Sequence, residues 1–207
     1  FKYEDLFVLQ NINISIHKNK VYGIVGPSGS GKSTLVDVLL GLLKPSGKCY
    51  VDEKIIDSDN LSAWQSLFGY VPQSIFLTEQ SILENIAFGV VRENIDYDSV
   101  RRAAKLAHLE DFILSLDKGF DTLAGERGVQ LSGGQRQRIG IARALYHDPE
   151  IIVFDEATSA LDGITEKVIM DAIHDLNGSK TIIMIAHRLK TIRECDHIFF
   201  INEGWGF

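Results

Sequence analysis

The chain has 207 residues, of which 45% are hydrophobic and 24% are charged, and its formal net charge at pH 7 is −7. This length and composition are typical of one ordinary globular domain. The net negative charge argues against a general nucleic-acid-binding protein, because such domains usually carry an excess of Lys and Arg. The apolar runs fall short of the roughly 18 residues that cross a bilayer, and no signal peptide precedes the first strand.

The ends of the chain and its two cysteines indicate the setting in which the domain works. Phe1 begins directly in strand-like sequence and Phe207 follows a turn at Gly204, so we expect one domain of a longer polypeptide. A membrane role would then come through a partner or a further segment. Cys49 and Cys195 have no metal-binding spacing, which predicts reduced, partly buried thiols rather than a disulfide.

In chain order, the first elements alternate between strand and helix patterns. Isoleucines at every second position of segment 12–16 predict a half-exposed antiparallel strand. The apolar run 21–25 lacks alternation, as expected of a strand that is buried on both faces. After a glycine-rich turn, apolar residues recur at i, i+3, i+4 and i+7 over 35–42, which predicts a helix that ends at 41–45.

Between about residues 74 and 147 the sequence changes to consecutive helical patterns. We expect no strand in this segment and interpret it as a helical insert on an α/β core. Its helices are expected at 81–88, 98–108 and 134–146.

Beyond the insert, buried strands are predicted at 151–154, 181–186 and 198–201, with a helix at 164–176. Strands that alternate with helices imply a mostly parallel sheet with right-handed crossovers. The carboxyl ends of such strands meet at one edge, where ligands collect in α/β folds.

Segment 26–34 carries the first functional motif. It fits the pattern G-x-x-x-x-G-K-[ST] and lies between the buried strand and the helix. Its glycines let backbone N–H groups converge on phosphate oxygens, and the helix N-terminus adds partial positive charge. Lys32 is placed to reach the β- and γ-phosphates, and the Ser33 hydroxyl to ligate Mg²⁺. The candidate phosphate-binding residues are Gly26, Pro27, Ser28, Gly29, Ser30, Gly31, Lys32, Ser33 and Thr34.

This motif defines the predicted fold class. A chance match is expected in roughly one per cent of unrelated chains of this length, and the strand–loop–helix context makes it rarer. The fold is predicted to be α/β, a P-loop NTPase core with a mostly parallel sheet, an N-terminal antiparallel β subdomain and a helical insert. The single domain is expected to span 1–207, with 1–73 and 148–207 forming the core and 74–147 the helical subdomain.

The predicted strand at 151–154 ends in two acids, Asp155 and Glu156. In a P-loop protein, an Asp at such a strand end holds Mg²⁺, often through water. The next residue is then placed to orient or deprotonate the attacking water. Acids also occur at strand ends merely because the chain surfaces there, but the phosphate cradle in the same chain disfavours that alternative.

His187 follows the next apolar strand. A lone His at such a position is more often a satisfied core histidine than a catalytic group. Its place at the carboxyl edge of the predicted sheet favours a contact with the γ-phosphate.

Segment 131–135, Leu-Ser-Gly-Gly-Gln, precedes the helix expected at 134–146. A hydroxyl and two glycines at a helix N-terminus form a second anion site, although the same residues also suit a plain N-cap. The residues in question, Ser132, Gly133, Gly134 and Gln135, match unaltered the signature of ABC (ATP-binding cassette) ATPases, and the chain resembles this family over essentially its whole length.

The resemblance implies roles for further residues. Tyr3 is similar to the aromatic residue that stacks on adenine. Gln73 resembles the glutamine that contacts Mg²⁺ and the attacking water and senses the membrane domain. Asp162 ends a Ser-Ala-Leu-Asp segment that resembles the loop crossing the dimer interface. His187 matches the family's switch histidine, and Glu156 its catalytic glutamate.

The resemblance also implies ATP and Mg²⁺ as ligands and a head-to-tail dimer of two copies, identical or different. ATP on the cradle 26–34 of one copy would be covered by residues 132–135 of the other. The implied reaction is ATP hydrolysis by in-line attack of water. The residues assigned to catalysis are Lys32, Gln73, Glu156 and His187, and those assigned to Mg²⁺ are Ser33, Gln73 and Asp155.

Segment 125–128 resembles a loop of ABC exporters that contacts the membrane domain and that importers usually lack. Within exporters, segments 40–45 and 85–89 look similar to bacterial flippases for lipid-linked oligosaccharides or polysaccharides. The implied partners are a second ABC ATPase domain and the transmembrane domain of an exporter, in the same polypeptide, with no nucleic acid. The implied location is the cytoplasmic face of a membrane.

Other classes that share the cradle and the signature fit less well. Chromosome-maintenance and DNA-repair ATPases place a long coiled coil between the two motifs, and no heptad run occurs here. Translation-factor relatives join two cassettes in one chain, whereas this chain has one. A nucleotide-binding regulatory module without hydrolysis is disfavoured by Glu156 and His187.

Overall fold

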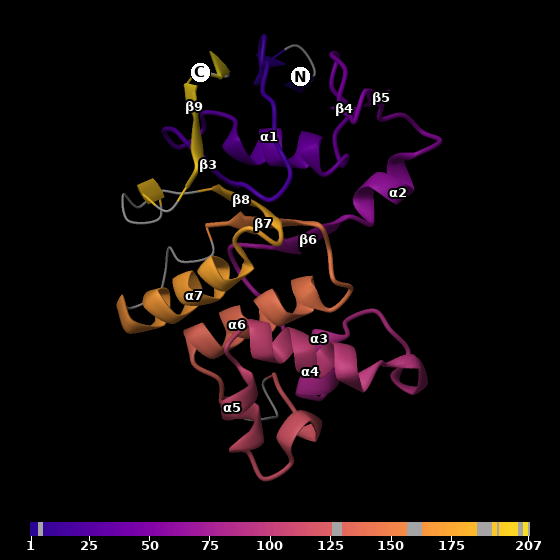
Figure 1. The fold of residues 1–207 in the computed structure, drawn as a ribbon, viewed down its shortest axis with the longest axis vertical. Coiled ribbons are helices and arrows are strands. Elements are labelled where there is room, and N and C mark those ends of the chain that lie inside the picture. The colour runs from indigo at the N-terminus through magenta and orange to yellow at the C-terminus, as the bar shows by residue number, and fades with distance from the viewer. Residues whose placement is uncertain are drawn as a thin grey trace.

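A six-stranded sheet forms the centre of the computed structural model (Figure 1). Its strand order is β10-β9-β3-β8-β7-β6, and neighbouring strands are parallel except for β10 with β9. The structure describes residues 1–3, 6–125, 130–156, 163–185, 192–193, 195–202 and 205–206. The strands are β3 Val21–Val25, β6 Phe68–Val71, β7 Ile151–Asp155, β8 Thr181–Ile185, β9 His197–Asn202 and β10 Trp205–Gly206.

The strands predicted from apolar runs are confirmed as β3, β7, β8 and β9, and β3, β7 and β8 are buried as predicted. The predicted burial of 198–201 is wrong, because β9 lies near the sheet edge beside the two-residue β10, and only Ile201 of β9 is buried. All residues of β8 and the three central residues of β7 are buried. Continuous burial of this kind arises because helices cover both faces of a parallel sheet, leaving neither face for alternating polar residues. The predicted fold class, with a mostly parallel sheet, is therefore confirmed.

Helices lie on both sides of the sheet (Figure 1). Helix α1 (Lys32–Leu39) covers one face, where Leu35 and Val36 pack with Val153 of β7. Helices α6 (Gly133–Leu145) and α7 (Gly163–Leu176) cover the other face, where residues such as Ile139 and Ile169 pack with the remaining strand positions. Successive residues of one strand thus belong to different cores, as the period-two geometry of strands requires.

The segment between β6 and β7 contains helices, as its patterns predict. In the described part of this segment no strand occurs. Helices α3 and α4 both pack against α6, and their apolar side chains continue the core beneath the sheet. The elements here are α3 Ile82–Ile86, η1 Arg92–Asn94, α4 Tyr97–Leu106, α5 Glu110–Leu114 and η2 Gly119–Asp121, before α6.

The strand predicted at 12–16 is wrong, although its pattern of burial is right. Ile12, Ile14 and Ile16 are half-buried against the core on the α1 side, and the residues between them are exposed. The segment forms no strand. The antiparallel part of the fold consists instead of two short pairs, which are β1 Lys2–Tyr3 with β2 Leu6–Phe7 and β4 Tyr50–Val51 with β5 Lys54–Ile55.

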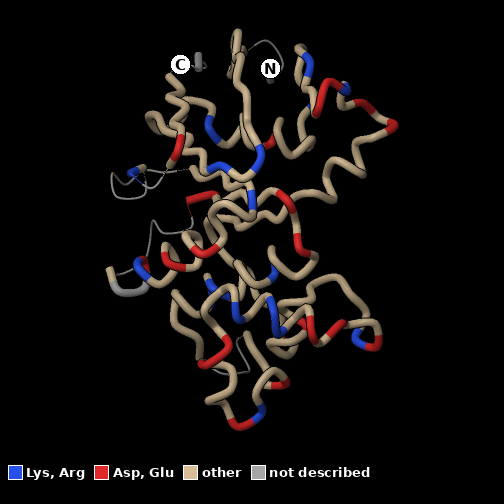
Figure 2. The backbone as a smooth tube through the Cα atoms, viewed as in Figure 1, with Lys and Arg blue, Asp and Glu red and all other residues tan. Residues whose placement is uncertain are grey.

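Three remaining sequence expectations concern cysteines, membrane spans and charge. Cys49 and Cys195 are half-buried and form no disulfide, as predicted. Within the described ranges, no helix combines the length and apolar character needed to span a bilayer. Positive and negative residues occur in both the upper and the lower half of the molecule, so the charge of −7 does not come from one acidic region (Figure 2).

Gly69 marks the closest approach between β6 and α6. A Cβ atom at this position would lie 2.4 Å from the carbonyl oxygen of Ala144 and 2.9 Å from Cγ of Pro149. The first contact is with backbone, which cannot rotate away as a side chain can. Any side chain at Gly69 therefore forces β6 away from α6, together with the segment that follows β6.

We expect Gly69→Ala to lower the free energy of unfolding by about 1–3 kcal/mol, the usual cost of overpacking a well-packed core. Urea unfolding followed by circular dichroism measures this change. Gly47→Ala is the matched control, because a Cβ there meets no atom within 4 Å, and its effect should stay within about 0.5 kcal/mol. Equal stability of the two variants would contradict the packing argument.

Candidate functional site

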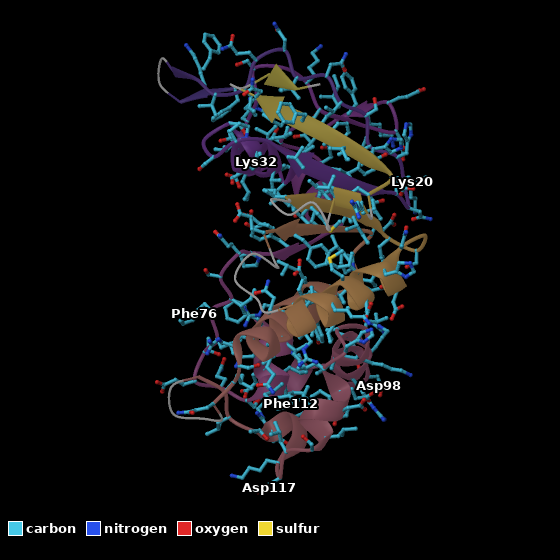
Figure 3. All side chains as sticks on the ribbon, turned by 90° about the vertical axis from the view of Figure 1, so that its left-hand side faces the viewer. Lys20, Lys32, Phe76, Asp98, Phe112 and Asp117 are labelled. Carbon is cyan, nitrogen blue, oxygen red and sulfur yellow. The ribbon has the colours of Figure 1, made fainter. Side chains whose placement is uncertain are left out.

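The carboxyl ends of β3, β6 and β7 bring the predicted site residues to one edge of the sheet. The glycine-rich loop follows β3, Gln73 follows β6, and Glu156 follows Asp155, the last residue of β7. This clustering results from parallel strands, whose carboxyl ends all face the same way. Figure 3 shows Lys32 in this region, whereas Lys20 lies at the opposite end of β3.

The loop after β3 has a backbone that requires glycine. Gly26, Gly29 and Gly31 have φ angles of 154°, 77° and 102°, which residues with a Cβ rarely adopt. At Gly26 a Cβ would also lie 2.0 Å from the carbonyl oxygen of Ile201 in β9. The loop therefore lies directly against β9. It can do so because Gly26 has no side chain.

Lys32 folds back over this loop. Its side chain is only 6% exposed, and Nζ donates hydrogen bonds to the carbonyl oxygens of Gly26 (3.0 Å) and Pro27 (2.8 Å). An ammonium group has three protons to donate, so one remains for a ligand in this arrangement. The burial concentrates the positive charge of Lys32 at the loop.

Two further features of the loop suit an anion. Ser30 is 5% exposed, and its Oγ has no hydrogen-bond partner within the described part of the chain. Helix α1 begins after Gly31, where no side chain caps it and no acid lies in the first turn. The N–H groups of the first turn of a helix lack intrahelical partners. A buried hydroxyl and free N–H groups thus face the same loop, and both are the donors that phosphate oxygens accept.

The two acids at the end of β7 each accept a hydrogen bond from a side chain of the β6 segment. The Tyr70 hydroxyl donates to Oδ2 of Asp155 at 3.0 Å, and Gln73 Nε2 donates to Oε2 of Glu156 at 2.9 Å. Glu156 leaves the strand with φ 49°, a left-handed conformation that is uncommon for a residue with a side chain and is enriched at functional sites. The chain turns at this residue, so successive acids meet different partners.

Burial is the main cause that raises the pKa of the Asp155 carboxyl, and the charges of Glu156 and Asp37 add to it, while Tyr70 and Lys32 act in the opposite direction. Burial, followed by the charge of Asp155, also raises the pKa of the Tyr70 hydroxyl far above its usual range. Tyr70 therefore keeps its proton at neutral pH and acts as the donor in this pair. The Asp155 carboxyl thus has two acids and one lysine within electrostatic reach.

The donor set fits Mg²⁺. Ser33, Gln73 and Asp155 offer hydroxyl, amide carbonyl and carboxylate oxygens, the ligand types that this ion prefers. Within the described ranges, no group of three or more His, Cys, Asp or Glu side chains is placed to hold a metal by itself. Mg²⁺ typically uses one or two carboxylates together with substrate phosphates. The cradle beside Asp155 provides the place for such phosphates.

The segment at 131–135 begins helix α6. Ser132 Oγ accepts a hydrogen bond from the backbone N–H of Gln135 at 3.2 Å, and the Ser132 N–H donates to Gln135 Oε1 at 2.8 Å. This capping box confirms the N-cap interpretation. Gly133 is exposed at the same helix end, where the N–H groups of the first turn lack intrahelical partners. The cap leaves room for the predicted anion site and does not exclude it.

Within one chain, the glycine-rich starts of helices α1 and α6 lie in different parts of the structure. Helix α1 and helix α6 lie on opposite sides of the sheet (Figure 1). Among the described residues, no hydrogen bond or ion pair joins 26–34 to 132–135. The two helix starts therefore make no direct polar contact with each other in the described part of the chain.

Some predicted residues lie outside the described part of the chain. These are His187, Asp162 and residues 126–128 of the segment predicted to mark exporters. Tyr3 belongs to β1, but its side chain is likewise outside the description. Their roles stay predictions.

Two residues that sequence reasoning did not single out connect the site to its surroundings. Tyr70 holds Asp155, as described above. Arg143 of α6 donates to the backbone oxygens of Asn85 (2.8 Å) and Phe76 (3.1 Å), and its guanidinium lies 4.7 Å from the ring centroid of Phe88. Phe76 itself is 73% exposed and lies at the surface in Figure 3. The segment after Gln73 is thereby tied to α6.

Comparisons with known proteins agree with this geometry. The profile of the family described as "ABC transporter" matches residues 9–159. The chain is 43% identical over 201 residues to ABC transporter B family member 22 of Arabidopsis thaliana, covering 97% of this chain and 16% of that protein. It is 42% identical over 201 residues to the heterocyst differentiation ATP-binding protein HepA of Nostoc sp., covering 97% of this chain and 33% of that protein.

A solved structure is similar as well. A bacterial Atm1-family ABC exporter with ATP bound superimposes with a TM-score of 0.86 at 38% identity, covering 99% of this chain and 36% of that chain. This chain therefore spans well under half the length of each of these relatives.

We expect Gly26→Ala to weaken ATP binding by about ten- to hundredfold. The added Cβ pushes the loop away from Ile201, and we expect the displaced loop to lose one hydrogen bond between a backbone N–H and a phosphate oxygen, which is worth about 1.5–3 kcal/mol. Titration with a fluorescent ATP analogue measures the change. Gly29→Ala is the control within the same loop, since a Cβ there meets no atom within 4 Å and only the φ angle of 77° opposes it. Equal losses in both variants would show that φ, rather than contact with β9, decides the loop geometry.

Proposed function

Because this chain belongs to the ABC transporter family, whose ATP-binding domains hydrolyse ATP, we propose that it is the ATP-hydrolysing motor domain of a membrane exporter. The observation that supports this proposal is the buried Lys32, which lies over the glycine-rich loop after β3, one strand removed from β7 and its terminal Asp155. This combination suits a triphosphate, because positive charge and free N–H groups stand opposite a cation-binding carboxylate.

The chain's own residues divide the work of binding. The loop amides, Ser30 Oγ and Lys32 Nζ hold phosphate oxygens, and Lys32 exchanges one or both of its carbonyl partners for them. Ser33, Gln73 and Asp155 hold the metal, and the Mg²⁺ ion, when bound, supplies charge that neutralises the phosphate oxygens. Tyr3, whose side chain is outside the description, is proposed to stack on the adenine.

Glu156 is proposed to polarise the attacking water, and its present partner shows how it is held. Gln73 Nε2 donates a hydrogen bond to Oε2 of Glu156 at 2.9 Å, so this carboxylate has a side-chain partner before any substrate arrives. The same Gln73 is a proposed metal contact, so metal binding and water orientation share one side chain. His187 is proposed to keep the γ-phosphate in line with the attacking water.

We further propose that catalysis requires a head-to-tail dimer. The start of α6 offers the exposed residues Ser132 and Gly133, and no hydrogen bond in the described part of its own chain directs it to the loop after β3. Residues 132–135 of a second copy, with Asp162 near the same interface, would complete the enclosure of ATP. Enclosure excludes water and aligns fixed dipoles with the charge that develops on the γ-phosphate.

The partner in the membrane is proposed to be an exporter's transmembrane domain in the same polypeptide, with this domain on the cytoplasmic face. Supporting this, the relatives include an Atm1-family ABC exporter, of which this chain covers 36%. The chain spans 16% of the Arabidopsis relative, which leaves most of that protein for other domains.

A finer proposal is a flippase for lipid-linked oligosaccharides or polysaccharides, based on segments 40–45 and 85–89. Asn85 is fully buried and bonds to Thr78 through both its side-chain oxygen (3.0 Å) and its amide nitrogen (3.1 Å). The fold of the helical segment therefore already explains this residue. The flippase proposal accordingly rests mainly on 40–45.

We expect Glu156→Gln to lower the rate of ATP hydrolysis by at least about a hundredfold, the usual minimum for loss of a general base. The variant keeps the shape of the side chain and still binds ATP, so an ATP-bound dimer should accumulate. Phosphate release measures turnover, and light scattering with and without ATP measures mass. Full turnover in this variant would remove Glu156 from the catalytic role.

The dimer has a separate test in the Glu156→Gln background. Adding Ser132→Arg places a long charged side chain at the exposed start of α6, so we expect loss of the ATP-induced dimer with unchanged ATP affinity of the monomer. Ser58→Arg, at an exposed position on the segment before α2 (Leu61–Gln65), is the control and should leave dimerisation intact. An ATP-induced dimer that persists with Ser132→Arg would argue against residues 132–135 as the interface.

A further inference from the structure

Tyr70 reaches the metal-site acid from the neighbouring strand. In the parallel register of β6 and β7, Tyr70 is paired with Val153. Asp155 lies two residues beyond Val153 and so on the same face of the sheet. Such a diagonal neighbour is within reach of a long aromatic side chain. The hydroxyl spans this diagonal and donates to Oδ2 of Asp155 at 3.0 Å.

The surroundings of Asp155 make its orientation dependent on this contact. The negative charges of Glu156 and Asp37 act on the Asp155 carboxylate, and the positive charge of Lys32 opposes them. Within the described part of the chain, Tyr70 is the one side chain that donates a hydrogen bond to this carboxylate. A hydrogen bond depends more steeply on angle than these charge interactions do, so the Tyr70 hydroxyl favours one orientation of the carboxylate.

We propose that Tyr70 is a positioning residue that orients Asp155 for Mg²⁺ in the nucleotide complex. The proposal rests on the proposed function and assigns a further residue to the same site. With Oδ2 engaged by the hydroxyl, Oδ1 is the oxygen that remains for the metal or for a water bound to it. Groups that hold a metal ligand in place commonly change metal affinity by about ten- to a hundredfold when they are removed.

The hydroxyl, rather than the ring, carries this role. Tyr70 is 41% exposed, so the rest of its side chain is covered by the protein, and removal of the whole ring would change more than the hydrogen bond. Tyr70→Phe keeps the ring and removes only the oxygen. This substitution therefore tests the role of the hydroxyl in orienting Asp155 without changing the ring.

The test uses the full chain, Mn²⁺ as the probe and a non-hydrolysable ATP analogue. Electron paramagnetic resonance measures free Mn²⁺ as it is titrated into the protein–analogue complex. For Tyr70→Phe we expect about a tenfold loss of Mn²⁺ affinity, with unchanged affinity for the analogue in EDTA. Tyr97→Phe is the control: Tyr97 is 51% exposed, and its hydroxyl makes no hydrogen bond in the described ranges, so no change is expected.

Coupling to Asp155 is tested with a double-substitution cycle. If Tyr70 acts through Asp155, adding Tyr70→Phe to Asp155→Asn lowers Mn²⁺ affinity no further. Unchanged Mn²⁺ affinity in Tyr70→Phe, an equal loss of analogue binding in EDTA, or full additivity in the cycle would each overturn the proposal. Absence of metal-dependent nucleotide binding in the unsubstituted chain would instead overturn the proposed function, and the role of Tyr70 with it.

Discussion

The contact between the loop after β3 and the backbone of β9 is the constraint on which the site depends. Gly26 has no space for a side chain because the carbonyl oxygen of Ile201 occupies it. The loop is thus pressed against a strand of the same sheet, and Lys32 closes over it from the first turn of α1. Backbone packing at Gly26, together with the two hydrogen bonds from Lys32, therefore determines where the N–H groups of this loop lie.

The strand order then decides what faces this loop. Only β8 separates β3 from β7, and neighbouring strands lie about 4.8 Å apart, so the acids of β7 stand about 10 Å from the loop strand. That gap suits a phosphate group and a hydrated metal. On the far side of β7, strand β6 supplies Tyr70, which donates to Asp155, and the segment after β6 supplies Gln73, which donates to Glu156. Across the sheet, the loop after β3 is followed by the acids at the end of β7 and then by Tyr70 and Gln73, which donate hydrogen bonds to those acids.

The sequence predicted the parts of this arrangement that are local and missed those that depend on pairing. Segment 26–34 was recognisable because its glycines, Lys32 and the flanking elements are contiguous in the chain. Strand β6 was not predicted, since it has four residues that include Gly69 and its partner lies more than 80 residues away. Tyr70 was missed for the same reason.

Segment 12–16 shows the reverse case. Its alternate burial follows from the local sequence, but a strand also needs a hydrogen-bonded partner, and this segment forms no strand. For Ser132, sequence left an N-cap and an anion site open, and the structure establishes the cap alone.

Arg143 has a mechanical consequence for the helical part. One guanidinium bonds the backbone oxygens of Phe76 and Asn85 and stacks on Phe88, while its own backbone belongs to α6. The planar guanidinium of Arg143 therefore connects α6 with Phe76, Asn85 and Phe88. The backbone of the exposed Phe76 is thereby joined to the last turn of α6, the helix whose other end begins after Ser132.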